Sequence, residues 1–167
     1  MAIIGGDPSR WYDRGSRVVT TYNVLEKTTK ALSSMIQGRA RHGCILMKEN
    51  GFSSILVTGG YHYGGIKSTE LLSLSSEGNN WVSTSDMDLA VNRYGHSMTL
   101  TKNGALVIGG QSDTNTFLKS IEIFNLTTQS WTEYGQSLTT PRSMFGGIIE
   151  LPAVLFGCQT KPINITG

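Results

Sequence analysis

The chain has 167 residues, of which 20 are glycine and 16% are charged, and its formal net charge at pH 7 is +2. Ordinary soluble domains carry ~7% glycine and ~25% charged residues, so this composition favours an all-β protein with many tight turns. The Lys and Arg residues are scattered along the chain, which argues against a nucleic-acid partner. The apolar runs are too short for a signal peptide or a membrane span, so neither is expected, and nor is insertion into a membrane.

A repeat with a period of 50 residues runs through the chain. The same interval separates Gly59 from Gly109 and Trp81 from Trp131. Each of the two glycines belongs to a pair that ends an apolar run, where glycine has a backbone freedom that other residues lack. The apolar runs with their glycines lie at residues 2–6, 55–60 and 106–110, and a degraded copy lies at 154–158.

Four short strands are predicted in the clearest unit. Residues 96–100 alternate polar and apolar side chains, as a half-buried strand does. Asn103 and Gly104 predict a hairpin with a type I′ turn, because both residues accept the positive φ angles that this turn needs. Residues 105–108 are continuously apolar, as in a strand covered on both faces. The outer strands are predicted at 120–124 and 131–134, and the preceding unit repeats the pattern at 44–47, 55–60, 71–74 and Trp81.

The start of each unit carries a second mark of the repeat. Arg39 and His42 begin one unit with the pattern Arg-x-x-His, and Arg93 and His96 begin the next. Together with the Gly-Gly strand ends and the spaced tryptophans, this pattern resembles the kelch-repeat family, closest to the broad branch that includes galactose-oxidase-like propellers. The resemblance implies an all-β, kelch-type β-propeller, in which each blade is a four-stranded antiparallel sheet packed around an axis.

Two units depart from this pattern. The first has no tryptophan near Thr29 or Lys30, where one is expected. The last has Phe145 in place of the histidine, and its Gly157 is followed by Cys158 rather than by a second glycine.

The repeats predict about three to four blades' worth of sheet within residues 1–158. Closed propellers usually have ~4–8 blades, so we expect an open or partial array: a fragment, or a piece completed by another chain. The expected units are a partial blade at 1–38, full blades at 39–88 and 89–138, and a partial blade at 139–158, followed at 159–167 by a tail or the start of the next unit.

The repeated arginines have two interpretations. Arg39, Arg93 and Arg142 stand at the start of the innermost strand of each unit. They either satisfy backbone carbonyls and neighbouring loops, which we favour, or ring the axial opening and bind acidic partners. His42 and His96 share their register and are expected to be structural residues rather than metal ligands.

Other repeated positions are expected to lie between the blades. Trp81 and Trp131 would fill that space with large apolar area. Cys44 occupies the position equivalent to Met98 and is expected to be a buried free cysteine that behaves as a small hydrophobe. A disulfide with Cys158 is not expected, because the two cysteines belong to strands of distant repeats.

The loops that follow the second and fourth strands of a blade share one face, because strands alternate in direction. Such loops often form the binding face of repeat proteins, and aromatic residues in them are enriched at binding hot spots. The alternative is that they are ordinary solvated loops packed on themselves. The predicted binding surface consists of Arg10, Trp11, Tyr12, Tyr61, His62, Tyr63, Arg93 and Arg142.

Two glycosylation sequons begin at Asn125 and Asn164. They would carry glycans only if the chain entered a secretory pathway. The first falls in a predicted turn, where a glycan is sterically acceptable.

The sequence therefore favours a non-catalytic scaffold that binds a protein partner through its loops, with no catalytic residue, metal or cofactor. One alternative is a fragment of a galactose-oxidase-like or carbohydrate-processing propeller enzyme whose active site lies partly outside this chain. Such a copper site needs converging Tyr, His and Cys ligands. Another alternative is a purely architectural segment of a large extracellular array.

Overall fold

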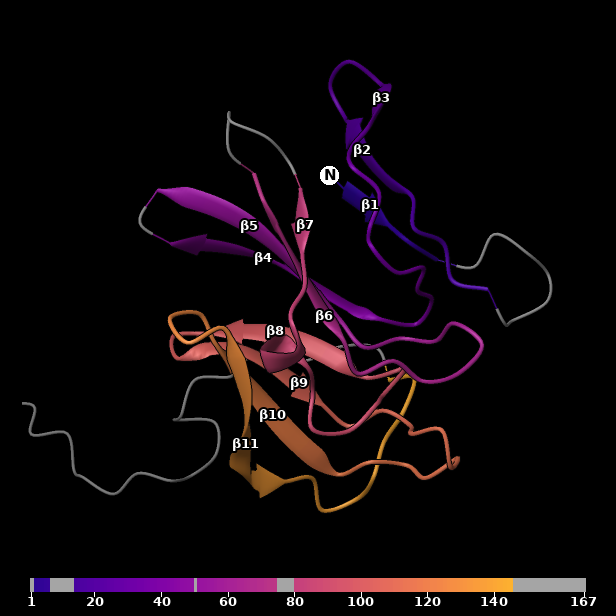
Figure 1. Cartoon of the computed structure of the whole chain (residues 1–167), viewed down its shortest axis with the longest axis vertical. Coiled ribbons are helices and arrows are strands. Elements are labelled where there is room, and N and C mark those ends of the chain that lie inside the picture. Colours follow the sequence, from indigo (N-terminus) through magenta and orange to yellow (C-terminus); the bar gives the residue numbers. More distant parts are fainter. Residues whose placement is uncertain (1, 7–13, 50, 75–79, 146–167) are drawn as a thin grey trace, which may run out of the picture.

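The computed structural model describes residues 2–6, 14–49, 51–74 and 80–145 (Figure 1). These residues form three antiparallel sheets placed side by side, which confirms the predicted all-β class and the propeller-like blades. The first sheet has the order β1 (Ala2–Ile4), β2 (Val19–Asn23), β3 (Thr28–Ala31). The second has the order β4 (Gly43–Glu49), β5 (Phe52–Thr58), β6 (Thr69–Ser73), β7 (Trp81–Val82). The third has the order β8 (Ser97–Thr101), β9 (Gly104–Ile108), β10 (Ser120–Asn125), β11 (Ser130–Ser137).

Strand pairing places the two repeated tryptophans at the same point of their sheets. Trp81 on β7 pairs with Leu72 on β6, and Trp131 on β11 pairs with Phe124 on β10. In the first sheet Thr29 occupies this position. The prediction that the first unit lacks a tryptophan near Thr29 therefore holds in the register of the strands.

Apolar side chains pack between neighbouring sheets. Val19, Met35, Val57, Leu72 and Trp81 form one buried cluster, which joins the first sheet to the second. A second buried cluster joins the second sheet to the third and is made of Met47, Leu56, Met87, Leu89, Ala105, Val107, Phe124 and Trp131. The predicted role of the tryptophans between blades is confirmed, because each faces the preceding sheet.

The tryptophan side chains are also held by hydrogen bonds. The indole N–H of Trp81 donates to the Ser33 carbonyl oxygen at 2.8 Å, and that of Trp131 donates to Thr69 Oγ1 at 2.9 Å. Both acceptors belong to the neighbouring sheet or the segment that follows it. Each tryptophan thus joins two sheets through its apolar ring and its polar edge, as buried indoles usually do.

The glycine pairs join one sheet to the start of the next. Gly60 N–H donates to the Arg93 carbonyl oxygen at 2.8 Å, and Gly6 and Gly110 make the same bond to Arg39 at 3.0 Å and to Arg142 at 2.7 Å. Gly59 has a φ of +61°, and a Cβ atom on it would lie 2.6 Å from the Arg93 carbonyl oxygen. Only glycine accepts this conformation and this close approach without strain.

The hairpin of the third sheet is confirmed, but its predicted type I′ turn is wrong. Thr101 pairs with Gly104, so the two residues of the loop are Lys102 and Asn103. A type I′ turn needs positive φ at both of its central residues, and here the positive φ of 138° falls on Gly104. Gly104 lies next to the turn, and a Cβ atom on it would lie 2.2 Å from the Phe124 carbonyl oxygen.

The inner edges of successive units are linked by a backbone ladder. Gly95 N–H donates to the Arg41 carbonyl oxygen at 2.8 Å, and Met144 N–H donates to the Gly95 carbonyl oxygen at 2.7 Å. All three residues have φ between 54° and 60°. Residues 142–145 therefore dock on the third sheet as the earlier unit starts dock on theirs.

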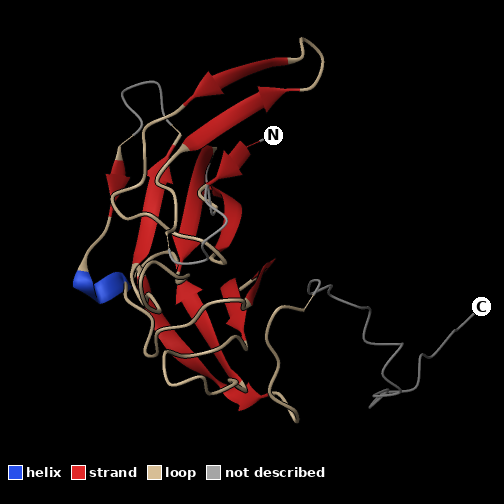
Figure 2. Ribbon diagram, turned by 90° about the vertical axis from the view of Figure 1, so that its right-hand side faces the viewer, coloured by secondary structure: helices blue, strands red, loops and turns tan. Residues whose placement is uncertain are grey.

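The connections between sheets add residues that the periodic pattern did not predict. The 3₁₀-helix η1 (Ser85–Met87) lies outside the sheets, as Figure 2 shows in blue, and its Met87 is buried between the second and third sheets. Met35 fills the equivalent place between the first and second sheets.

Candidate interaction surface

Arg39 is fully buried, and its guanidinium is held by an ion pair and by hydrogen bonds to backbone carbonyl oxygens. Its Nη2 atom lies 2.6 Å from Glu70 Oε1, and its Nη1 atom donates to the carbonyl oxygens of Gly59 at 2.7 Å and Ser68 at 2.8 Å. Glu70 in turn accepts the backbone N–H groups of Ile36 and residue 37. Burial lowers the pKa of the Arg39 guanidinium, and the charge of Glu70 opposes that shift.

Arg93 repeats the same arrangement in the third sheet. It forms a salt bridge with Glu122, and its Nη1 atom donates to the carbonyl oxygens of Gly109 at 3.0 Å and Ser120 at 3.2 Å. Glu122 also accepts the backbone N–H of Ala90 at 2.9 Å. Arg93 has no exposed area, so it belongs to the interior and not to the predicted binding surface. Its geometry matches the structural interpretation of the repeated arginines.

The glutamates that hold these arginines were missed by the sequence analysis. Glu70 and Glu122 are buried and stand at matching positions of the repeat. A buried charge needs a partner, so the recurrence of a glutamate after 52 residues and of an arginine after 54 was the available signal. Arg142 is exposed at the start of the next unit, where its carbonyl oxygen accepts the Gly110 N–H.

Two tyrosines stack where the loop after β5 meets the start of the next unit. Tyr61 exchanges backbone hydrogen bonds with Ala40 at 2.8 and 3.0 Å. Its ring meets the ring of Tyr94 edge to face at 5.1 Å. Tyr61 is half-buried and Tyr94 is buried, so this pair lies beneath the exposed residues of the loop.

His62 and Tyr63 connect this loop to the first sheet. His62 Nδ1 accepts a hydrogen bond from the Gly15 N–H at 3.1 Å, and the His62 and Tyr63 rings meet edge to face at 4.8 Å. The Arg14 guanidinium lies 5.7 Å from the centre of the Tyr63 ring, within cation–π range. Tyr63 remains 62% exposed and has a φ of 57°.

Asp113 connects the same loop to the third sheet. Its carboxylate accepts hydrogen bonds from the Gly65 N–H and from the Asn92 side chain. The loops after Gly60 and Gly110 therefore lie on one face, along the right-hand side of Figure 1. We call the part formed by Arg14, Tyr61, His62, Tyr63, Asn92 and Asp113 the loop face.

The structure thus brings Tyr61, His62 and Tyr63 together. The same face includes three residues that were not predicted: Arg14, Asn92 and Asp113. The only sequence feature that could have indicated them was their place within or beside the loops that the repeat brings together. The predicted residues Arg10, Trp11 and Tyr12 lie outside the described residues.

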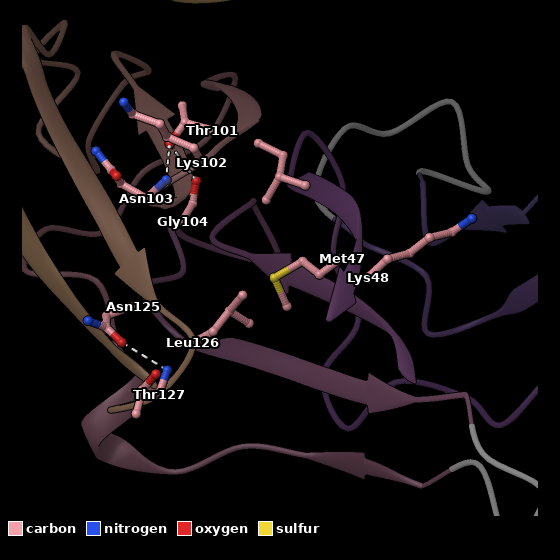
Figure 3. A pocket seen from close by; sticks show the side chains of 10 residues that line it. Met47, Lys48, Thr101, Lys102, Asn103, Gly104, Asn125, Leu126 and Thr127 are labelled. Carbon is pink, nitrogen blue, oxygen red and sulfur yellow. Dashed lines mark hydrogen bonds between the residues drawn. The ribbon is translucent and has the colours of Figure 1, made fainter. Parts of the chain in front are cut away.

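A groove of about 430 Å³ lies at the opposite end of the sheets, beside the hairpin of the third sheet. Met47 and Leu126 point toward each other inside it, whereas the ends of Lys48 and Lys102 point away from its centre (Figure 3). Asn125 at its rim is exposed, and its Oδ1 atom accepts the Thr127 N–H at 2.8 Å. No charged groups converge among the residues that line this groove, which gives it little character as a polar binding site.

The other predicted sequon residue, Asn164, lies outside the described residues. Asn125 is the exposed last residue of β10 and directly precedes the turn, whereas it was expected within that turn. Glycosylation at either residue remains a prediction that depends on the secretory pathway.

Cys44 differs from its predicted environment. It does pair with Val57 as Met98 pairs with Val107, so the two are equivalent in register. Its side chain is nevertheless exposed, at a groove lined by apolar residues of the first two sheets such as Ile4. The prediction of a buried cysteine is wrong, because this groove leaves the thiol open to solvent. Cys158 lies outside the described residues.

The described part of the chain contains no group of three or more His, Cys, Asp or Glu side chains that could hold a metal ion. It also contains no helix long and apolar enough to cross a membrane.

Comparison with known proteins points to one family. A family model described as the Kelch motif matches residues 92–136, which include the whole of β8, β9 and β10. Kelch-like protein 41b of Danio rerio is 30% identical over 79 residues. The aligned stretch makes up 47% of this chain and only 13% of that relative.

Proposed function

Because this chain is built of kelch repeats, we propose that it is a non-catalytic scaffold that binds a protein partner through the loop face. The comparisons support a protein-interaction scaffold in general terms. The choice of the loop face rests on the geometry of the loops after the glycine pairs.

The observation that carries the proposal is the exposed ring of Tyr63 on a braced loop. Tyr63 is 62% exposed, yet its loop is held by Gly15 on one side and by Asp113 on the other. Exposed aromatic side chains on pre-organised loops are good anchors, since little conformational entropy is lost on binding. An ordinary solvated loop packed on itself would not need bonds to both neighbouring sheets.

The test compares two exposed tyrosines. Tyr134 on β11 is 44% exposed and lies outside the loop face, so Tyr134→Ala is a matched control for Tyr63→Ala. We expect Tyr63→Ala to weaken partner binding by about thirtyfold, a typical hot-spot loss, and Tyr134→Ala to leave it unchanged. The measurement is the affinity of a captured partner for each purified variant. Equal affinity for the wild type and for Tyr63→Ala would overturn the choice of this surface.

The non-catalytic part of the proposal has a separate test. A galactose-oxidase-like enzyme would contain copper and a cross-link between a Tyr ring and a Cys sulfur. Metal analysis and intact mass spectrometry of the purified protein measure both. We expect neither bound copper nor the mass change of a cross-link, and finding both would replace the scaffold with an oxidase.

We also propose the unit boundaries predicted above, with full blades at 39–88 and 89–138. The first of these ranges encloses β4 to β7 and the second encloses β8 to β11, which supports the division. Limited proteolysis should cut between units before it cuts within a sheet. Early cuts inside either range would argue for other boundaries.

A further inference from the structure

The hydrogen bond between the loop face and the first sheet depends on the protonation state of His62. The Gly15 backbone N–H can only donate, so His62 Nδ1, at 3.1 Å, must be the acceptor. A neutral imidazole has one acceptor nitrogen and one donor nitrogen, so the ring proton resides on Nε2. A protonated imidazole carries a proton on both nitrogens and can accept no hydrogen bond.

The same histidine lies beside the contact that covers one side of Tyr63. The rings of His62 and Tyr63 are 4.8 Å apart, and the Arg14 guanidinium lies 5.7 Å from the Tyr63 ring centre. Arg14 precedes Gly15 directly, so the hydrogen bond to His62 and the cation–π contact to Tyr63 hold the same short segment. A positive charge on His62 would remove the bond and would also repel Arg14.

We propose that proton uptake by His62 releases the Arg14–Gly15 segment and so makes the loop face sensitive to pH. The effect of this release on partner binding rests on the function proposed above, whereas the release itself does not depend on that function. On proton uptake Tyr63 is freed from Arg14, and its exposed ring gains a second open side.

The charged groups around His62 leave it free to act in this way. Arg14 approaches from the first sheet, and the guanidinium of Arg39, from the segment before β4, is turned inward to Glu70. Asp113 reaches this loop from the third sheet, but its carboxylate already accepts the Gly65 N–H and the Asn92 side chain. The tethered Gly15 segment packs against the Arg39 backbone, which fixes the direction of the Gly15 N–H.

Nuclear magnetic resonance of the whole chain labelled with ¹⁵N tests the proposal directly. The chain has three histidines, and burial lowers the pKa of His42 to about 4 and that of His96 to about 3. The His62 ring signal is identified by its absence from His62→Gln. We expect its Nδ1 to be unprotonated while the Gly15 hydrogen bond is present, and the Gly15 amide resonance to shift with the same midpoint as the ring.

Hydrogen exchange of the Gly15 amide supplies the magnitude. After correction for the intrinsic pH dependence, exchange should become about fivefold faster on protonation, as expected for the loss of one ordinary hydrogen bond. His62→Gln is the matched variant, because its side-chain oxygen can accept the bond but does not titrate. In His62→Gln the corrected Gly15 exchange should be independent of pH, and in His62→Ala it should be fast at every pH.

Two results would overturn the proposal. One is a Gly15 amide that does not respond while the His62 ring titrates. The other is a Gly15 amide that titrates equally in His62→Gln. If Gly15 responds as expected but Tyr63→Ala leaves partner affinity unchanged, the switch stands and the proposed binding surface fails, so the two ideas are separable.

Discussion

The interior junctions and the loop face join the same three sheets by different means. In the interior, Arg39 and Arg93 each pair with a buried glutamate and donate to two backbone carbonyl oxygens. On the loop face, the second sheet meets the first through His62 and meets the third through Asp113. The interior is therefore repeated and closed, whereas the loop face is particular to each junction and open to solvent. The stability of the fold should depend on the interior junctions, and recognition of a partner should depend on the loop face.

The largest effect is expected when a buried ion pair is broken. Glu122→Ala leaves the buried Arg93 guanidinium without its counter-ion and the Ala90 N–H without its acceptor. Removal of one partner of a buried pair costs about 3–5 kcal/mol, so the variant should be severely destabilised or fail to fold. Chemical denaturation measures the loss. The control is Asp88→Ala, which removes a more exposed pair with Lys67 and should cost less than ~1 kcal/mol.

Acid should weaken the interior through the buried histidines. Burial, with the charge of Arg93 as a second cause, lowers the pKa of His96 to about 3. As the pH falls below about 6.5, the unfolded chain therefore takes up a proton that the folded chain does not, and stability falls until the pH nears 3. Each such proton adds up to ~1.4 kcal/mol per pH unit to the slope of the unfolding free energy against pH.

His96→Phe tests this explanation with a residue that the chain itself uses. Phe145 stands at the equivalent position of the next unit, 3.3 Å from where a Cβ atom on Gly109 would be. The variant should fold, and its unfolding free energy should depend on pH between 4 and 6 by up to ~1.4 kcal/mol per unit less than the wild type. An unchanged slope in urea titrations across that range would assign the acid sensitivity to other groups.

A smaller loss is expected where a glycine meets the next unit. A Cβ atom at Gly59 would lie 2.6 Å from the Arg93 carbonyl oxygen, and its φ of +61° is also unfavourable for alanine. Gly135 has a φ of +73° but no atom within 4 Å of such a Cβ, so Gly135→Ala isolates the backbone term. Backbone strain of this kind costs about 1–3 kcal/mol. We expect Gly59→Ala to lower the melting temperature more than Gly135→Ala, and equal shifts would deny the importance of the close approach.

The smallest change in stability is expected on the loop face. Tyr63→Ala removes an exposed ring and should alter the unfolding free energy by less than ~0.5 kcal/mol, as surface substitutions usually do. The same variant is expected to lose most of its partner affinity. A cooperative thermal melt recorded beside the binding measurement separates the two effects. Loss of folding in Tyr63→Ala would assign this residue to the framework.

The repeat interval predicted most of the framework. The positions of the strands, the glycine pairs and the tryptophans follow from a hydrophobic period of two and from the special conformations of glycine. The predicted loop residues Tyr61 to Tyr63 lie on a common face, because strands alternate in direction. The ion pair of Arg93 with Glu122 and the exposure of Cys44 did not follow, since both depend on how segments distant in the sequence pack together.

The sequence by itself determined that this chain is a series of antiparallel sheets with a common repeat, because the periodic apolar pattern and the glycines act locally and recur. Only the tertiary structure decided that Arg93 pairs with Glu122, residues 29 positions apart, and that His62 accepts a bond from Gly15, 47 positions away. Such contacts depend on the distance and direction of side chains brought together by packing. A one-dimensional pattern records which residues recur, whereas the partner of each polar atom is set by the sheet that packs against it.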